Sequence, residues 1–259
     1  MLELDSTRWS ELQHAYGCAS DIPPLLSKLL TGDGDLSDVW GQLCHQYSVY
    51  SATFAAAPYV LRYAESAPLE RKIESLSFLG TVHAYKTPDN IAETPNDIMD
   101  WYARLIPTAA DLATNTLQTE KLNNNDAIYL LESIAAFNEC NGPDKTLSDL
   151  VNDEFTVECP RCNVEVYVWP NENSHGFFAA SEDPVSNPTP NKTNVKMAKI
   201  PRPADKAIDS ADAYPWLYNL AIDAGYAKIS ESLRSMYGTV GCPECKGEFN
   251  LMEELKNAT

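Results

Sequence analysis

Two pairs of cysteines, far apart in the chain, constrain the fold of this protein more than any other feature of its sequence. Residues 159–162 read Cys-Pro-Arg-Cys and residues 242–245 read Cys-Pro-Glu-Cys. Thiolates spaced two residues apart can hold one edge of a tetrahedron from a tight turn, and two such pairs complete the four-sulfur shell of a structural zinc site. The predicted metal ligands are Cys159, Cys162, Cys242 and Cys245.

The residues around each pair favour a short β-hairpin. Strand-like residues lead into the first pair at 155–157 and leave it at 164–169, and the same arrangement recurs at 239–241 and 247–251. Four cysteines close the coordination shell, so the zinc is expected to be structural rather than catalytic. His175, the histidine nearest in sequence, has no glutamate partner in a catalytic zinc motif.

The segment between the two pairs is too long for a compact zinc ribbon. It has 79 residues, against about 15–20 in the compact form. Prolines predict an extended loop at 181–205, and a helical pattern returns at 209–237. Residues 151–259 are therefore predicted to form a zinc-ribbon-like lobe with a loop and helical insertion at 171–237.

Apolar residues keep a helical period from the start of the chain to about residue 150. The first stripe begins after Asp21, an expected N-cap, and the next runs from Leu36 to Tyr47. Strand signals are lacking, so residues 1–150 are predicted to be a helical domain, either an α-solenoid or an irregular bundle. The further helices are expected at roughly 50–65, 69–84, 97–115 and 126–140. The side chains expected to be buried between paired helices include Leu26, Leu29, Trp40, Leu43, Leu76, Trp101 and Ile134.

Aromatic and histidine residues in this half also have a structural interpretation. Tyr16, Trp40, Tyr50 and Phe54 occur at helical spacing, which is typical of core residues. His14 and His45 are expected to cap or bridge neighbouring helices through their ring nitrogens. No nucleophile, phosphate-loop or dinucleotide motif accompanies them, so no catalytic residue is predicted.

The same half contains a series of short motifs. His-Ala-Tyr-Gly at 14–17 is followed by Asp-Ile-Pro at 21–23, Trp40, His-Gln at 45–46 and Val-Tyr-Ser-Ala-Thr at 49–53. Over residues 9–80 the chain resembles a family of bacterial HEAT-like proteins that carry this series, although Tyr47 stands where the family pattern usually has glycine. Several relatives sit among toxin–immunity modules, so the resemblance implies a binding scaffold more than a reaction.

The chain of 259 residues carries a formal charge of −18, of which −12 lies on residues 1–150 and −6 on residues 151–259. An acidic surface repels phosphate backbones, which argues against nucleic-acid binding. It favours a basic protein partner. The alternative is that the acidic residues serve only to keep the protein soluble.

The sequence also indicates the cellular compartment in which the protein is expected. No apolar run approaches about 18 residues, and the N-terminus lacks the pattern of a signal peptide. Four of the seven cysteines form the metal pairs, which argues for a reducing compartment, and Cys18, Cys44 and Cys140 are expected to be buried. We expect a cytoplasmic protein that has no membrane partner.

These observations and the resemblance together predict a non-enzymatic protein-binding module. Its expected role is that of an immunity protein in a toxin–antitoxin pair, which neutralises a cognate bacterial toxin by occluding the toxin's active site. The alternative is an intracellular HEAT-like scaffold or regulatory protein with a structural zinc site. A third possibility is an enzyme whose catalytic residues one sequence does not reveal.

Overall fold

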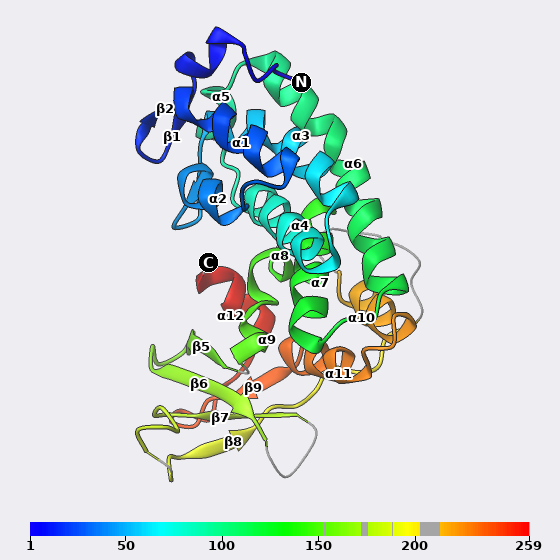
Figure 1. Cartoon of the computed structure of the whole chain (residues 1–259). Coiled ribbons are helices and arrows are strands. Elements are labelled where there is room, and N and C mark those ends of the chain that lie inside the picture. Colours follow the sequence, from blue (N-terminus) through cyan, green and yellow to red (C-terminus); the bar gives the residue numbers. More distant parts are fainter. Residues whose placement is uncertain (153, 172–175, 188, 203–212, 259) are drawn as a thin grey trace. The chain divides into compact units, whose positions relative to one another are not determined.

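Helices dominate both parts of the chain (Figure 1). The computed structural model describes residues 1–152, 154–171, 176–187, 189–202 and 213–258. Across these residues it contains twelve α-helices and several small antiparallel sheets. The chain divides into two units, Met1–Thr116 and Leu117–Thr259. This boundary falls earlier in the chain than the one expected near residue 150, because the helix at Asn124–Phe137 packs on the short helices that follow it.

The first unit is built around a pair of long helices, α3 and α4, on which the shorter α1 and α2 pack. The structure confirms the helices expected at 50–65 and 69–84, and α6 is longer than the expected 97–115. The elements are η1 (Thr7–Glu11), β1 (Gln13–His14), β2 (Gly17–Cys18), η2 (Ala19–Asp21), α1 (Ile22–Thr31), α2 (Ser37–Leu43), β3 (Cys44–His45), β4 (Ser48–Val49), α3 (Ser51–Ser66), α4 (Leu69–Ala84), α5 (Pro88–Ala92) and α6 (Asn96–Thr119), which runs past the unit boundary.

Most of the predicted core is buried. Leu26, Leu29, Leu43 and Leu76 have no exposed surface in the first unit, and neither has Ile134 in the second. The two predicted tryptophans are only half-buried. Trp40 packs edge-on against Phe78 with ring centroids 5.0 Å apart. A large indole is seldom buried completely even where it contributes to a core.

Two β-hairpins correct the prediction that this half has no strands. β1 pairs with β2 in the register His14↔Gly17, and β3 pairs with β4 in the register His45↔Ser48. The stripe from Leu36 to Tyr47 is therefore not one helix, because α2 ends at Leu43. Tight turns reverse the chain after each histidine, and such two-residue ladders are too short to show a strand pattern in the sequence.

His14 connects the first hairpin to the start of α1. Its Nε2 lies 3.0 Å from the Asp21 carboxylate, and the Tyr16 backbone N–H donates to its Nδ1 at 3.1 Å. Asp21 is the N-cap residue of α1, as predicted, but its side chain makes no capping hydrogen bond, because its carboxylate contacts the His14 imidazole instead. Tyr16 itself is 70% exposed, so its assignment to the core was wrong.

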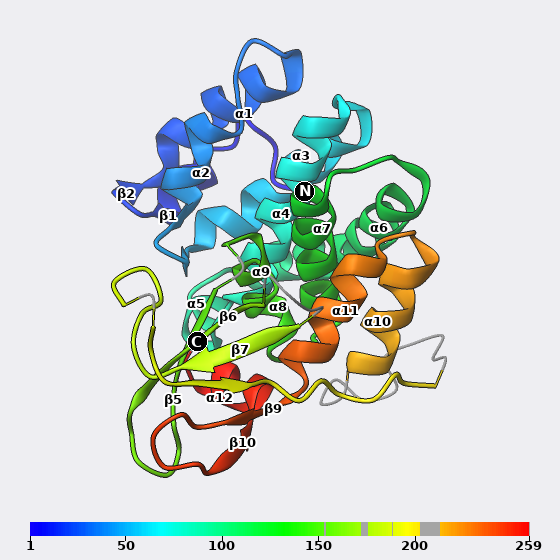
Figure 2. The same ribbon diagram turned by 90° about the horizontal axis from the view of Figure 1, so that it is seen from below.

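The second unit joins a helical layer to a four-stranded antiparallel sheet with the strand order β5-β6-β7-β8 (Figure 2). A separate hairpin, β9–β10, carries the second cysteine pair. The elements are α7 (Asn124–Phe137), α8 (Pro143–Thr146), α9 (Asp149–Asn152), β5 (Phe155–Glu158), β6 (Glu165–Pro170), β7 (Phe177–Ala180), β8 (Lys192–Asn194), α10 (Tyr214–Asp223), α11 (Ala227–Met236), β9 (Thr239–Gly241), β10 (Glu248–Asn250) and α12 (Leu251–Ala258).

Several elements of this unit differ from the expectation. The helical pattern at 209–237 appears as α10 and α11, whereas β8 lies inside the segment that was expected to be a loop. β8 is three polar residues long, so only its pairing with β7 makes it a strand. α12 was not predicted, and it packs on β5 with Leu251, Met252 and Leu255 buried. Residues 203–212, part of the expected loop and helical start, lie outside the described residues.

Within the described part of the chain, no helix is both long enough and apolar enough to cross a membrane.

Candidate metal centre

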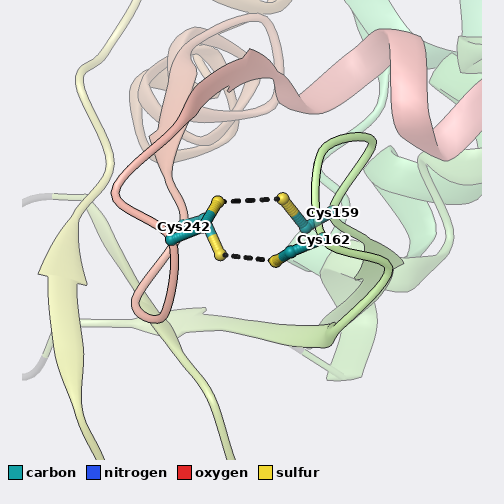
Figure 3. Close-up of side chains that lie close together, drawn as sticks. Cys159, Cys162 and Cys242 are labelled. Carbon is teal, nitrogen blue, oxygen red and sulfur yellow. Dashed lines mark hydrogen bonds between the residues drawn. The ribbon is translucent and has the colours of Figure 1, made fainter.

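The structure brings the four predicted cysteines together. Their Sγ atoms all lie within 4.8 Å of one another. The Cys159 and Cys245 sulfurs are 3.8 Å apart, and those of Cys162 and Cys242 are 3.7 Å apart, as the dashed lines in Figure 3 mark. Zinc–sulfur bonds of about 2.3 Å place the sulfurs of a regular tetrahedron about 3.8 Å apart. Two of the six sulfur–sulfur distances match this value and the others do not exceed 4.8 Å, so the cluster is compatible with a tetrahedral metal ion.

The first cysteine pair sits in a tight turn closed by backbone hydrogen bonds. The Cys159 N–H donates to the Val164 carbonyl at 2.9 Å, and the Asn163 N–H donates to the Cys159 carbonyl at 2.9 Å. Asn163 adopts a left-handed conformation with φ 56°, which asparagine tolerates better than most residues. This turn brings both thiols of the pair to one side of the chain.

The second pair repeats this turn at matching positions. The Cys242 N–H donates to the Gly247 carbonyl at 2.8 Å, and the Lys246 N–H donates to the Cys242 carbonyl at 3.1 Å. Lys246 has φ 60°, so it occupies the position that Asn163 takes in the first turn. Two separate sequence segments thus form the same cysteine-bearing turn.

Hairpins support both turns, as the sequence predicted. The β5–β6 ladder ends at Glu158↔Glu165 and the β9–β10 ladder ends at Gly241↔Glu248, directly beside the cysteines. β8 links the two hairpins, because it pairs with β7 and the Thr193 hydroxyl donates to the Gly241 carbonyl. The protein backbone therefore positions the two halves of the cluster next to each other.

Each pair contributes one buried and one exposed thiol. Cys159 and Cys242 have no exposed surface, whereas Cys162 and Cys245 reach solvent. Burial acts to raise the pKa of Cys159, but backbone N–H groups of Arg161 and Cys162 point at its sulfur and bring its pKa to about 7. For Cys242, burial raises the pKa and the neighbouring thiols add to the effect. Neighbouring thiolates repel one another. A divalent cation bound between the four sulfurs would offset this repulsion and favour the thiolate form of all four cysteines.

Four thiolates would leave no coordination position open for a water or a substrate. Such a shell suits a metal that holds the fold together, and tetrahedral sulfur ligation is typical of zinc or of iron. Arg161 lies between the two cysteines of the first turn, and Lys246 follows Cys245 in the second. Both cations would offset part of the negative charge of a four-thiolate centre.

Other candidate groups are placed elsewhere. Among the described residues, the four cysteines form the one cluster that could hold a metal ion. His83 is buried with its Nδ1 3.0 Å from the Tyr102 hydroxyl, and burial lowers its pKa to about 4. Cys44 and Cys140 are buried as predicted, whereas Cys18 is exposed, contrary to the prediction. His175 lies outside the described residues.

Comparisons with protein-family models, with curated proteins and with solved structures give no significant match for this chain. The fold and the cysteine cluster define a mainly helical protein with a candidate four-cysteine metal site in its second unit.

Proposed function

We propose that this chain is a non-enzymatic protein-binding module whose second unit is locked by one structural zinc ion. The observation that carries the proposal is the closed set of four sulfurs, because such a shell offers no position for catalysis. The metal then serves the fold, and function is left to the surfaces that the fold presents.

Zinc would join two turns that lie far apart in the chain. The two cysteine turns are separated by a long segment that includes the short strand β8 and the helices α10 and α11. Binding free energy at a site that does not exist in the unfolded chain is also folding free energy. The metal would therefore fix the ends of this segment beside each other.

Charge suggests the kind of partner. The formal charge of −18 gives the surface an excess of carboxylates, which accelerates association with a basic protein and discourages contact with nucleic acid. The narrower form of the proposal is an immunity protein that occludes the active site of a cognate toxin. That form rests on this acidity and on the resemblance of residues 9–80 to bacterial HEAT-like proteins. An intracellular scaffold with the same zinc site is the second candidate.

The test is expression of the full chain beside the toxin gene that adjoins its own in the native genome. The immunity proposal expects cells to survive with the chain and die without it, and the two purified proteins to form a complex. In that complex, raising the salt from about 50 to about 500 mM should slow association and leave dissociation nearly unchanged. Equal killing with and without the chain would contradict the immunity role. An adjoining gene of another kind, whose product nevertheless binds the chain, would favour the scaffold.

A further inference from the structure

Two tyrosines at the tips of the first unit's hairpins are unusually exposed. Tyr16 lies in the turn between β1 and β2 and is 70% exposed, and Tyr47 lies in the turn between β3 and β4 and is 62% exposed. The Ala15 N–H donates to the Gln42 carbonyl at 2.9 Å, which attaches the first tip to the last turn of α2. Figures 1 and 2 accordingly show β1 and β2 beside α2.

Neighbouring rings hold both tyrosines in place. The Tyr16 and His45 rings meet edge-on with centroids 5.6 Å apart, and the Tyr16 hydroxyl lies 3.4 Å from His45 Nδ1. Tyr47 stacks on Tyr85 with centroids 4.5 Å apart and planes 19° from parallel. We call Tyr16, His45, Tyr47 and Tyr85 the hairpin-tip patch. Rigid, exposed aromatic rings of this kind are enriched at the centres of protein interfaces.

Two consecutive residues of the second tip adopt a left-handed backbone conformation. Gln46 has φ 49° and Tyr47 has φ 64°. Both fall in the left-handed region, where residues other than glycine, asparagine and aspartate are disfavoured. Glycine or asparagine would suit this turn better, so folding alone does not account for a tyrosine here. The strain is an independent sign that the exposed ring has a use.

The two hairpins of the patch lie in an acidic stretch of the chain, although the cation Lys86 adjoins Tyr85 in sequence. Between residues 9 and 61 the chain has one cation, Lys28, against the five acids Glu11, Asp21, Asp33, Asp35 and Asp38. The two segments that form the hairpins, 13–21 and 37–50, contain Asp21 and Asp38 and no lysine or arginine. Electron-rich aromatic faces in an acidic surrounding attract cations, and arginine stacks on such faces best.

We propose that the hairpin-tip patch is the contact site for a basic segment of a partner protein, which lays an arginine side chain over the rings of Tyr16 and Tyr47. The proposal rests on the protein-binding function and adds to it a surface and a partner chemistry. The rings supply rigid apolar area, and the surrounding carboxylates supply complementary charge.

The experiment uses the zinc-loaded full chain and a short synthetic peptide in which three arginines alternate with glycines. Binding is measured by titration calorimetry and by NMR of ¹³C-labelled tyrosine rings. A second peptide carries citrulline, a neutral analogue of arginine, at the same three positions. The variants are Tyr16→Ala, Tyr47→Ala and Tyr47→Phe, and Tyr129→Ala is the matched control, because Tyr129 is a partly exposed tyrosine on α7.

We expect the arginine peptide to bind the wild type. Tyr16→Ala and Tyr47→Ala should each raise the Kd of that peptide by about tenfold. Tyr47→Phe and Tyr129→Ala should bind like the wild type, and the citrulline peptide should bind at least about tenfold more weakly because its side chains lack the positive charge. If the wild-type chain does not bind the arginine peptide, the proposal is overturned. Equal binding by Tyr47→Ala and Tyr129→Ala would overturn it too. Either result leaves the protein-binding function to stand on its own co-expression test.

Discussion

Replacing Glu132 with glutamine should stabilise the protein, and the gain should grow as the pH rises. The Glu132 carboxylate lies on α7, where the Ser148 hydroxyl donates to it at 3.0 Å. Burial raises its pKa from the ordinary 4.5 to about 8; the hydrogen bond from Ser148 opposes this rise, and the charges of Asp149 and Asp144 add to it. The folded state therefore favours the protonated acid.

The direction of the pH dependence follows from this raised pKa. The contribution of Glu132 to stability is fully present below pH 4.5 and is lost as the pH rises through about 8. At about 1.36 kcal/mol per pH unit, the loss is under about 1 kcal/mol at pH 5, about 3 kcal/mol at pH 7 and about 4 kcal/mol at pH 8. A neutral amide of the same shape avoids this loss, and Ser148 can still hydrogen-bond to it.

The assay is denaturant unfolding of the wild type and Glu132→Gln between pH 5 and pH 8. Comparing the two proteins at each pH cancels the other titrating groups, including the cysteines. The difference in unfolding free energy should widen by about 3 kcal/mol across this range. Glu120→Gln is the control, because Glu120 is exposed and its substitution should give a flat difference. A flat difference for Glu132→Gln as well would refute the reasoning, because it would mean that the carboxyl group titrates normally in the folded protein.

Three further predictions concern the first unit. Leu29→Ala should lower the unfolding free energy by about 2–5 kcal/mol, because Leu29 has no exposed surface, whereas Ser27→Ala, an exposed position on the same helix, should change it by less than about 0.5 kcal/mol. Gln46→Gly should raise the melting temperature through a gain of about 0.5–1 kcal/mol, since Gln46 has φ 49°; a lower melting temperature would contradict the strain argument. Burial lowers the pKa of His83 to about 4 from the ordinary 6.5, so its contribution should be present above pH 6.5 and lost as the pH falls through about 4. Between pH 7 and pH 4, the unfolding free energy of His83→Gln should therefore fall by roughly 3 kcal/mol less than that of the wild type. Parallel acid-unfolding curves for the two proteins would count against the lowered pKa of His83.

The sequence predicted the four-cysteine cluster well because its signal is local. Each cysteine pair lies within four residues, and the strands on either side alternate clearly enough to be expected in advance. The spatial meeting of the two pairs was inferred from coordination chemistry alone, since four thiolates require a common centre. The leucines of α1 and α4 were equally predictable, because helical spacing is a short-range pattern.

The elements that were missed either depend on a strand partner farther along the chain or are too short to show a pattern. β8 becomes a strand only beside β7, and the two-residue ladders at His14 and His45 are too short to carry a period. Tyr16 and Tyr47 fit a helical stripe, yet both lie in turns that expose them. The position of Tyr47 depends on a left-handed backbone at Gln46 and Tyr47 and on the end of α2 at Leu43, which residue spacing does not reveal.

The central claim is that one zinc ion joins the two cysteine turns, and X-ray absorption at the zinc edge, combined with elemental analysis of the purified full chain, tests it most directly. The account predicts one zinc per chain with four sulfur neighbours at about 2.3 Å. Cys242→Ser should lose the metal and loosen the second unit, whereas Cys18→Ser, at an exposed cysteine outside the cluster, should keep it. A folded chain prepared without chelator that holds iron, or that holds no metal and four freely titrating thiols, would contradict the account.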